Sequence, residues 1–353
     1  MREDKLKAAV LGLKEGGRVL LEAASGSDYF QIEAVADKDT KLVEKVAAEY
    51  KCSAYDDYRQ LVIQSRLDCL LVAAGLYSCD EHIRAAIKKK VNILKLAPMA
   101  RNFDEAAELV RLAEEENVKF AVANPSRFAA SFLAFREFLK QGRVDKIFLL
   151  TATCSFGHQS HPAWHTDPKL AGGGVLLRNC YAVIDQIVWN FATPQQVYSL
   201  NTNLAGDRQQ RLYLTEDTAV MTLKFSDAFI GNLIASKAFG PKREFLQVFG
   251  KDKILTVTDA GFTVSDSAGQ VEEEQQGDDD EFSRVRKLLE NFALSILLPD
   301  NNRLCSSGRE NLSNMAVIES AYLSARTGMP EEPRRIVDMS PTEPTGVWPV
   351  RRR

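Results

Sequence analysis

The chain has 353 residues, enough for two domains of ordinary size, and 45% of them are hydrophobic, which is ample for buried cores. Its formal net charge of -3 argues against a general attraction to nucleic acid, and because no apolar run reaches the roughly 18 residues of a membrane span we expect no membrane partner. From the charged N-terminus MREDKLK we expect no signal peptide. The six cysteines form no C-x-x-C pair, so we expect buried free thiols and a cytoplasmic protein.

The first forty residues predict a strand, a glycine turn, a helix and a second strand that ends in an acid. Lys7–Leu11 is an apolar run typical of a strand buried on both faces, and Arg18–Ala24 has helical periodicity. The turn between them consists of Gly12, Leu13, Lys14, Glu15, Gly16 and Gly17. The second strand, Ile32–Ala36, leads to Asp37, about 20 positions after the last glycine, the usual separation for a carboxylate that binds the ribose of a dinucleotide.

The turn departs from the pattern G-x-G-x-x-G, because Lys14 holds the place of the glycine that lets the backbone approach the pyrophosphate. The Lys14 side chain either neutralises a phosphate or occupies its volume. Two interpretations stay open: a bound dinucleotide, or a Rossmann-shaped scaffold whose pocket no longer binds one. If a dinucleotide binds, Asp37 favours NAD, whereas the neighbouring Lys38 can tolerate the 2′-phosphate of NADP.

The elements that follow alternate between helix and strand. Predicted helices are Thr40–Tyr50, Tyr55–Gln64, Asp80–Lys90 and Asn102–Glu115. Predicted strands are Asp68–Ala74, Val91–Leu94 and Val118–Ala123. Alternation of this kind predicts that residues 1–124 form a Rossmann domain with a doubly wound parallel sheet.

The pattern changes near Asn124. Helices are predicted at Ser131–Lys140, Val175–Phe191, Phe282–Leu297 and Arg309–Thr327, and strands at Lys146–Cys154, Gln196–Leu200, Ala219–Phe225, Phe229–Ser236, Phe245–Gly250 and Ile254–Thr258. Short strands without helices between them predict that residues 125–353 form an α/β domain with a large, mostly antiparallel open sheet. We expect the acidic stretch Glu272–Glu281 to be a solvated loop and the tail Pro330–Arg353 to lie over the surface.

Several phrases in this order resemble the glucose–fructose oxidoreductase / inositol dehydrogenase (Gfo/Idh/MocA) family. Among them are VLGLKEGG, EAVADKD, ILKLAPMARNFDEAAELV, NPSRF and WHTDPKLAGGGVLLRNCYAVIDQIVWNFATP. The resemblance extends from Lys7 to Gly328 and implies hydride transfer between NAD(P) and a carbon of a sugar or polyol. It implies cofactor contacts from the glycine turn and from Asp37, Lys38, Ala73, Ala74 and Leu96. It implies contacts to a sugar-like ligand from Arg127, Trp164, Arg178 and Asp185.

The family's catalytic positions are altered here. Its Glu-Lys-Pro motif corresponds to Leu96-Ala97-Pro98, so Ala97 occupies the position of the family's catalytic lysine. The Asp and His of the family's triple-glycine helix correspond to Arg178 and Ala182, whereas the acid Asp185 is retained. Transfer of a hydride to or from an alcohol carbon needs a group that moves the hydroxyl proton, so we expect that the ordinary mechanism of the family cannot run.

Histidines offer one replacement. His158, His161 and His165 lie close together beside Trp164, in a loop that approaches the substrate pocket in the family, and His165 is the best candidate for proton transfer. Their spacing could also hold a metal, but no nearby Cys or acid completes a zinc pattern, so we expect none. The alternative is a loop of surface histidines.

Tyr181 and Lys95 are the other candidates. A Tyr181 phenol beside Arg178 can act as an acid or base, or it can simply pack. Arg178 can bind a carboxylate or phosphate in a bidentate way, or it can pair with Asp185 or another acid and be structural. Lys95 is expected on the same side of a strand as Ala97.

Two functions therefore stay open. The first is a divergent NAD(P)-dependent oxidoreductase that acts on a sugar- or polyol-like substrate. The second is a non-catalytic relative that binds a nucleotide or sugar-like ligand, or serves as a subunit of an assembly. In either case we expect a homodimer or homotetramer, because an open sheet with helices on one side leaves its other face to be covered.

Overall fold

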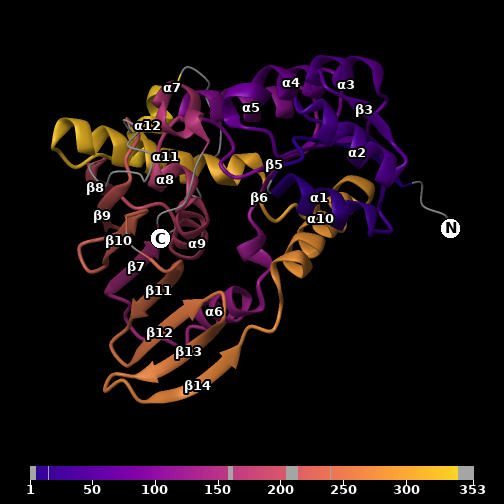
Figure 1. The fold of residues 1–353 in the computed structure, drawn as a ribbon. Coiled ribbons are helices and arrows are strands. Elements are labelled where there is room, and N and C mark those ends of the chain that lie inside the picture. Colours follow the sequence, from indigo (N-terminus) through magenta and orange to yellow (C-terminus); the bar gives the residue numbers. More distant parts are fainter. Residues whose placement is uncertain (1–4, 15, 158–161, 204–213, 239, 341–353) are drawn as a thin grey trace. The chain divides into compact units, whose positions relative to one another are not determined.

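The computed structural model describes residues 5–14, 16–157, 162–203, 214–238 and 240–340, which form two compact units (Figure 1). Among these residues, the first unit contains 5–100, 105–125 and 280–309, and the second contains 101–104, 126–279 and 310–340. The boundary expected after residue 124 treats each domain as one segment of chain. In the structure the later segment 280–309 belongs to the first unit, because its helix α10 (Glu281–Leu297) packs against α1 (Gly16–Ser25).

A parallel sheet forms the centre of the first unit, with the strand order β3-β2-β1-β4-β5-β6. The strands are β1 (Leu6–Leu11), β2 (Phe30–Ala36), β3 (Ser53–Tyr55), β4 (Cys69–Val72), β5 (Asn92–Leu96) and β6 (Phe120–Ala123). The Rossmann prediction is confirmed. All side chains of the short apolar strands β4 and β6 are buried, and so are all those of β1 except Lys7. The strand β3 was not predicted, because its three residues lie at the edge of the sheet and carry no periodic signal.

Helices connect these strands. They are α1, α2 (Thr40–Tyr50), α3 (Tyr58–Gln64), α4 (Leu76–Lys88) and α5 (Phe103–Glu115). The helix expected from Tyr55 begins three residues later, where the Asp57 carboxylate accepts a hydrogen bond from Arg59 N at 2.8 Å and caps α3. The helix expected from Asp80 begins earlier, since the buried side chains of Leu76 and Cys79 extend its apolar face.

The second unit contains an open sheet in the order β14-β13-β12-β11-β7-β10-β9-β8. The strands are β7 (Leu149–Ser155), β8 (Gln196–Thr202), β9 (Thr218–Lys224), β10 (Ile230–Ser236), β11 (Arg243–Phe249), β12 (Lys253–Thr258), β13 (Gly261–Asp266) and β14 (Val271–Gln276). Among the described strand pairs of this second sheet, only β7 with β10 is parallel, so the mostly antiparallel sheet is confirmed.

The prediction that the whole acidic stretch is a loop is wrong. It contributes strand β14, where we expected a loop that included Glu272–Gln276. All six side chains of β14 are exposed, so the sequence shows no alternation of apolar and polar residues there. Backbone pairing with β13, and ion pairs that Lys253 and Arg143 make with Glu272 and Glu273, hold the strand at the edge of the sheet.

Helices of the second unit are α6 (Ala130–Lys140), α7 (Pro168–Ala171), α8 (Val175–Arg178), α9 (Tyr181–Phe191), α11 (Gly308–Thr327) and α12 (Pro333–Met339), with the short 3-10 helices η1 (Pro125–Phe128) and η2 (Ala163–Thr166). The single helix predicted over Val175–Phe191 is wrong, because it breaks between α8 and α9. The Val175 carbonyl accepts from both Asn179 N at 3.0 Å and Cys180 N at 2.9 Å, and this widened turn ends α8. Arg178 and Tyr181 therefore lie on different helices.

A buried polar network joins η1, α9 and α11 within the second unit. The Arg127 guanidinium donates to both oxygens of Asp185, at 2.8 and 2.7 Å, and to Glu310 at 2.8 Å. Asn314 donates to Asp185 at 2.7 Å. Burial by itself lowers the pKa of Arg127, but the charges of Asp185 and Glu310 raise it above its ordinary value.

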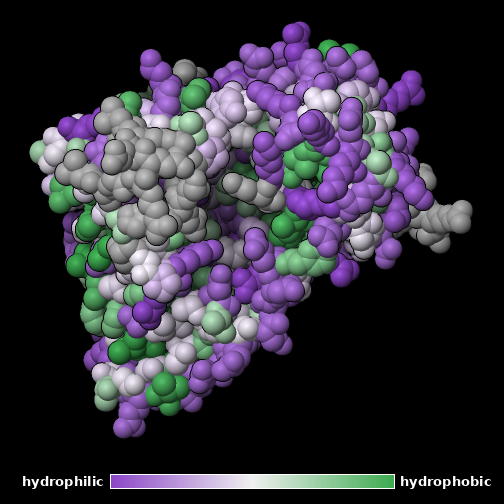
Figure 2. Space-filling model, in the orientation of Figure 1, coloured by the Kyte–Doolittle hydropathy of each residue, from purple (hydrophilic) through white to green (hydrophobic). Residues whose placement is uncertain are grey.

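The sheet of the second unit has one apolar face that remains exposed. Along β8, β9 and β10 buried and exposed side chains alternate. Leu200, Val220 and Ile234 are 58%, 43% and 40% exposed, and they are cross-strand neighbours in register. Figure 2 shows apolar side chains along the margin of the molecule where these strands lie. None of the described helices is both long and apolar enough to span a membrane.

Replacing Asp185 by Asn should destabilise the second unit strongly, by about 3 kcal/mol in the free energy of unfolding, because removing one partner leaves a buried charge poorly compensated. Urea denaturation followed by circular dichroism measures this. Replacing both partners, Arg127→Met with Asp185→Leu, should cost less than the sum of the single changes. Arg335→Met, which removes a surface ion pair with Glu332, is the matched control and should change stability by under about 1 kcal/mol. An Asp185→Asn protein as stable as the wild type would contradict this account.

Candidate functional site

The glycine turn of the first unit is closely packed against the strands beside it. Gly12 has a φ of 90°, and a Cβ at this position would lie 2.5 Å from Ala74 N. A Cβ at Gly17 would lie 2.0 Å from the Gly12 carbonyl oxygen and 3.1 Å from the Ala73 side chain. A Cβ at Gly16 would lie 2.8 Å from Leu96 Cδ1. The structure therefore brings the turn together with Ala73, Ala74 and Leu96, and packing by itself accounts for the glycines.

Asp37 lies beside this turn, as predicted. It is 5% exposed, and its Oδ2 accepts a hydrogen bond from Leu13 N at 2.8 Å while its Oδ1 accepts one from Asp39 N at 3.0 Å. Each carboxylate oxygen has a further lone pair, so Asp37 can still accept hydroxyl hydrogens of a ribose. Next to it, the Lys38 ammonium lies over the rings of Tyr58 and Tyr77, at 5.8 and 5.4 Å.

The residues at this edge of the sheet fit a dinucleotide. The helix α1 begins at the turn and offers N–H groups to a phosphate, and Asp37 offers acceptors to a ribose. The Lys14 side chain is exposed. Glu15, which we predicted as a further contact, lies outside the described residues.

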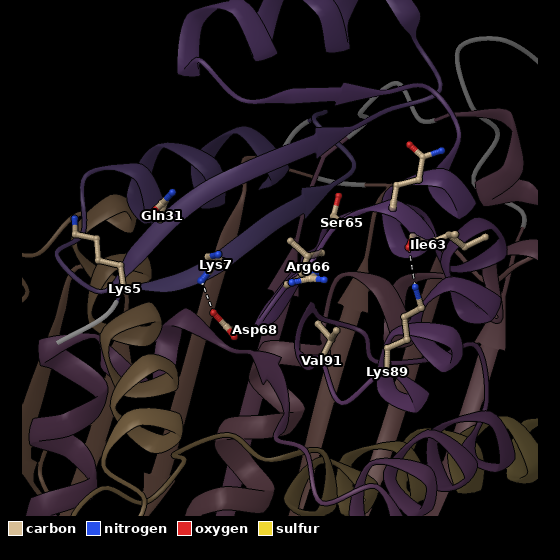
Figure 3. Close-up of a pocket in the computed structure, with 11 residues that line it drawn as sticks. Lys5, Lys7, Gln31, Ile63, Ser65, Arg66, Asp68, Lys89 and Val91 are labelled. Atoms are coloured by element: carbon tan, nitrogen blue, oxygen red, sulfur yellow. Dashed lines mark hydrogen bonds between the residues drawn. The ribbon is translucent and has the colours of Figure 1, made fainter.

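A separate cavity of about 920 Å³ lies at the amino ends of the strands of the same sheet (Figure 3). Lys5, Lys7, Gln31, Arg66, Asp68 and Lys89 are among its lining residues. Asp68 accepts a hydrogen bond from Lys7 N at 2.8 Å, and Lys89 donates to the Ile63 carbonyl at 2.9 Å. Ligands of parallel α/β sheets bind at the carboxyl ends of the strands, and this cavity lies at the amino ends.

Lys95 is buried in β5, with 3% of its surface exposed. Its Nζ donates to the carbonyl oxygen of Leu96 at 3.1 Å. This contact ties the ammonium to the backbone directly before Ala97.

In the second unit, Arg178 meets two of the other candidate residues. Its Nη2 lies 2.7 Å from His165 Nε2, and its guanidinium lies 4.4 Å from the centre of the Trp164 ring. Because an arginine can only donate, His165 Nε2 is the acceptor, and the imidazole is neutral with its proton on Nδ1. His158 and His161 lie outside the described residues. Within the described part of the chain, no group of three or more His, Cys, Asp or Glu side chains is arranged to hold a metal.

Other candidate residues of this unit have structural partners. Asp185 is bound by Arg127 in the buried network, so Arg178 does not form the alternative pair with Asp185. Tyr181 is 2% exposed, and its hydroxyl donates to Asn311 Oδ1 at 3.0 Å. Burial and the charge of Asp185 raise the pKa of the Tyr181 phenol well above its ordinary value. These contacts favour packing roles for Tyr181, Arg127 and Asp185.

Glu216 and Lys237, which no sequence motif singles out, lie near α8 in the second unit. The Glu216 carboxylate accepts hydrogen bonds from Gly174 N at 2.7 Å, Leu176 N at 2.9 Å and the Tyr322 hydroxyl at 2.9 Å, and so caps α8. Burial raises the pKa of Glu216. Lys237 follows β10 and is 6% exposed. The only sequence signal for it is a lysine directly after the apolar run FIGNLIAS.

Known proteins resemble this chain over most of its length. D-xylose 1-dehydrogenase (NADP(+)) 2 of Haloferax volcanii is 25% identical over 326 residues, which is 89% of this chain and 95% of that protein. The 2,7-anhydro-N-acetylneuraminate hydratase of Escherichia coli is 22% identical over 251 residues, 68% of this chain and 64% of that protein. The structure of levoglucosan dehydrogenase in complex with NADH and levoglucosan has the same fold, with a TM-score of 0.83, 13% identity and coverage of 93% of this chain and 99% of that one.

Family models match both units. Residues 6–124 match the oxidoreductase family model with an NAD-binding Rossmann fold, and residues 132–256 match the C-terminal domain of the same family. Together the two matches cover well over half of the chain, and its two sheets have the arrangement that the sequence predicts. The chain belongs to the Gfo/Idh/MocA oxidoreductase family.

Proposed function

We propose that the chain is an NAD(P)-dependent oxidoreductase that acts on a sugar- or polyol-like substrate, with NAD as the preferred cofactor and with catalytic groups that differ from those usual in the family. The observation that carries this proposal is the Asp37 carboxylate next to the glycine turn, bonded to Leu13 N at 2.8 Å. Family membership and the dehydrogenase relatives support it.

The residues of the first unit have distinct roles in this proposal. A bound nicotinamide cofactor supplies the hydride acceptor or donor. Asp37 accepts hydrogen bonds from the ribose hydroxyls, and its charge disfavours a 2′-phosphate, which is the reason for preferring NAD. The N-terminus of α1 stabilises the pyrophosphate, and the exposed Lys14 neutralises part of its charge.

Proton transfer needs a substitute for the groups absent at Ala97, Arg178 and Ala182. His165 is our first candidate, because its neutral imidazole carries the proton on Nδ1 while Arg178 fixes the ring through Nε2. Tyr181 and Lys95 follow: the Tyr181 hydroxyl is engaged with Asn311, and the Lys95 ammonium with a backbone carbonyl.

The alternative is a relative that binds a nucleotide or sugar-like ligand without catalysing the family reaction. The observation in its favour is that all three ordinary catalytic positions are changed together. A side chain that transfers the hydroxyl proton contributes about 10²- to 10⁴-fold to the rate of the reaction, so its loss would slow catalysis strongly.

We propose further that the second unit forms a homodimer or homotetramer through the exposed face of its sheet. Leu200, Val220 and Ile234 form a continuous apolar row across three neighbouring strands. A second copy of the chain would remove this row from water.

The cofactor proposal predicts that NADH binds the wild-type chain and that Asp37→Asn weakens its binding roughly 10- to 100-fold, through loss of charge-assisted hydrogen bonds to the ribose. NADPH should lose less, because the change also removes repulsion of the 2′-phosphate. Fluorescence titration measures both. Asp28→Asn, at the exposed amino end of β2, is the matched control and should change neither affinity.

The side chain at position 14 separates the two interpretations of the turn. If neither cofactor binds the wild type and Lys14→Gly restores binding, Lys14 occupies the phosphate site. If Lys14→Gly also fails to bind, the proposal of a dinucleotide site is wrong.

We expect little or no turnover of ordinary polyols and sugars with NAD or NADP, because Ala97, Arg178 and Ala182 remove the usual proton-transfer and orienting groups. A screen that follows nicotinamide absorbance tests this. Robust turnover would overturn this expectation but support the oxidoreductase proposal with substitute groups, and replacing His165, Tyr181 and Lys95 by Ala in turn would then identify the proton carrier. Replacing the true proton carrier by Ala should lower kcat at least about 100-fold, whereas replacing a residue that only packs should lower the stability of the protein instead.

For the oligomer, Ile234→Asp should shift the wild-type assembly toward monomers, because a charge in the apolar row cannot be buried without a partner. Light scattering at micromolar concentration measures the mass. Ile63→Asp, which changes an isoleucine that is 64% exposed in the first unit, is the control and should leave the mass unchanged. A monomeric wild type would overturn the proposal.

A further inference from the structure

The cavity at the amino ends of the first sheet is lined by more cations than acids. Its charged lining residues are Lys5, Lys7, Arg66, Lys89 and Asp68. They come from three segments of the first unit: the start of β1, the connection from α3 to β4, and the end of α4. Figure 3 shows Lys7, Arg66 and Lys89 around this one pocket. The fold thus brings four positive charges to one hollow, against a single negative charge.

Lys7 is an exposed cation on an inner strand. The strand β1 lies between β2 and β4, and all its other side chains are buried. The backbone N–H of Lys7 donates to Asp68 Oδ2 at 2.8 Å, so the acid lies beside this lysine. Within the described residues, however, Asp68 forms no ion pair with any of the four cations. The ammonium of Lys7 and the guanidinium of Arg66 likewise have no hydrogen-bond or ion-pair partner in the described part of the chain.

The other two cations are fixed in position by backbone carbonyls. Lys89 donates to the Val62 and Ile63 carbonyls, at 2.8 and 2.9 Å, and Lys5 donates to the Ser27 carbonyl at 3.2 Å. An ammonium has three N–H donors, so each lysine has at least one more to offer a ligand. Because these contacts already restrict the two side chains, a ligand that binds them pays less in conformational entropy.

This cavity is distinct from the proposed dinucleotide site. Lys7 and Gln31 are neighbours in register at the amino ends of β1 and β2, whereas the glycine turn and Asp37 follow the carboxyl ends of the same strands. Lys7 and Gly12 are five residues apart along the chain, which is roughly 16 Å at the rise of a strand. A dinucleotide at the turn therefore does not account for the cations of the cavity.

We propose that this cavity binds a small molecule with two or more phosphate groups. Arg66 offers planar, bidentate donors to phosphate oxygens, and the lysines offer compact positive charges. Four cations against one acid favour a polyanion over an ion with a single charge, because each further charge adds an attraction of its own. A volume of about 920 Å³ is within the range of small-molecule pockets. The proposal goes beyond the proposed function, because it concerns a second site in the first unit.

The test is calorimetric titration of the full chain with inorganic pyrophosphate, with inorganic phosphate and acetate as anions of lower charge. We expect pyrophosphate to bind at least tenfold more tightly than phosphate, and acetate to bind more weakly than either. No binding of pyrophosphate at about 1 mM would overturn the proposal. A single-stranded oligonucleotide that binds more tightly than inorganic triphosphate would also overturn it, because the partner would then be a nucleic acid.

Variants locate the binding site. Lys7→Met and Arg66→Met should each weaken pyrophosphate binding roughly tenfold, the lower end of the range for a hydrogen bond to a charged group, because the site is open to water. Lys88→Met is the matched control: it removes an exposed lysine directly before Lys89 that does not line the cavity, and it should leave affinity unchanged. An equal loss in the control would mean that only the overall charge attracts the anion. That result, or unchanged affinity in both Lys7→Met and Arg66→Met, would overturn the proposal.

Stability shows that these variants report on binding. Because the Lys7 and Arg66 side chains are exposed, both variants should have a Tm within about 2 °C of the wild type without ligand. Pyrophosphate should raise the Tm of the wild type and of Lys88→Met more than that of Lys7→Met or Arg66→Met, since a ligand stabilises in proportion to its affinity. Equal increases in all four proteins would contradict the proposed site.

Failure of this inference is distinct from failure of the proposed function. Saturating NADH should leave the affinity for pyrophosphate unchanged, because the two sites lie at opposite ends of the same strands. Displacement of pyrophosphate by NADH would mean that both bind at the glycine turn, and would overturn the second site. If NADH does not bind at all, a loss of affinity in Arg66→Met and Lys7→Met would still uphold the cavity while the oxidoreductase proposal fails.

Discussion

The buried pair of Arg127 and Asp185 decides how charge is arranged in the second unit. Both side chains are nearly inaccessible to water. The two hydrogen bonds between them, the one that Arg127 donates to Glu310 and the one that Asn314 donates to Asp185 satisfy groups that would be costly to bury alone. Because Asp185 is committed to Arg127, it does not neutralise Arg178. The guanidinium of Arg178 contacts His165 and Trp164, and its charge lowers the pKa of Lys237.

The proposed function depends on a comparison with the catalytic positions that the family resemblance implies. The proposed function takes Arg178 to stand where an Asp is usual in the family, and Ala97 and Ala182 to stand where proton-transfer groups are usual. Close packing requires the glycines of the triple-glycine segment. A Cβ at Gly174 would lie 1.8 Å from the Glu216 carbonyl oxygen, and one at Gly173 would lie 2.0 Å from the Tyr322 hydroxyl.

The first unit illustrates the same separation between packing and chemistry. Gly12 and Gly17 are required by the close contact between β1, α1 and the segment after β4, with or without a ligand. Glycines alone therefore do not distinguish a working dinucleotide site from a scaffold. Asp37 is more informative, because its carboxylate lies at the turn, is nearly buried, and still has acceptor capacity for a ribose.

The sequence by itself determined the Rossmann sheet, the position of Asp37 beside the turn and the mostly antiparallel second sheet, because buried strands and amphipathic helices carry their period locally. It did not determine β14, the break between α8 and α9, or the return of α10 to the first unit. It also did not indicate that Asp185 pairs with Arg127 or that Lys237 is buried without an ion pair. Each of these depends on which distant segments meet: β14 exists because β13 offers a free edge, and Lys237 is buried because β10 ends where α8 packs. Contacts between residues far apart in the chain leave no periodic trace in it, so only the tertiary structure could decide them.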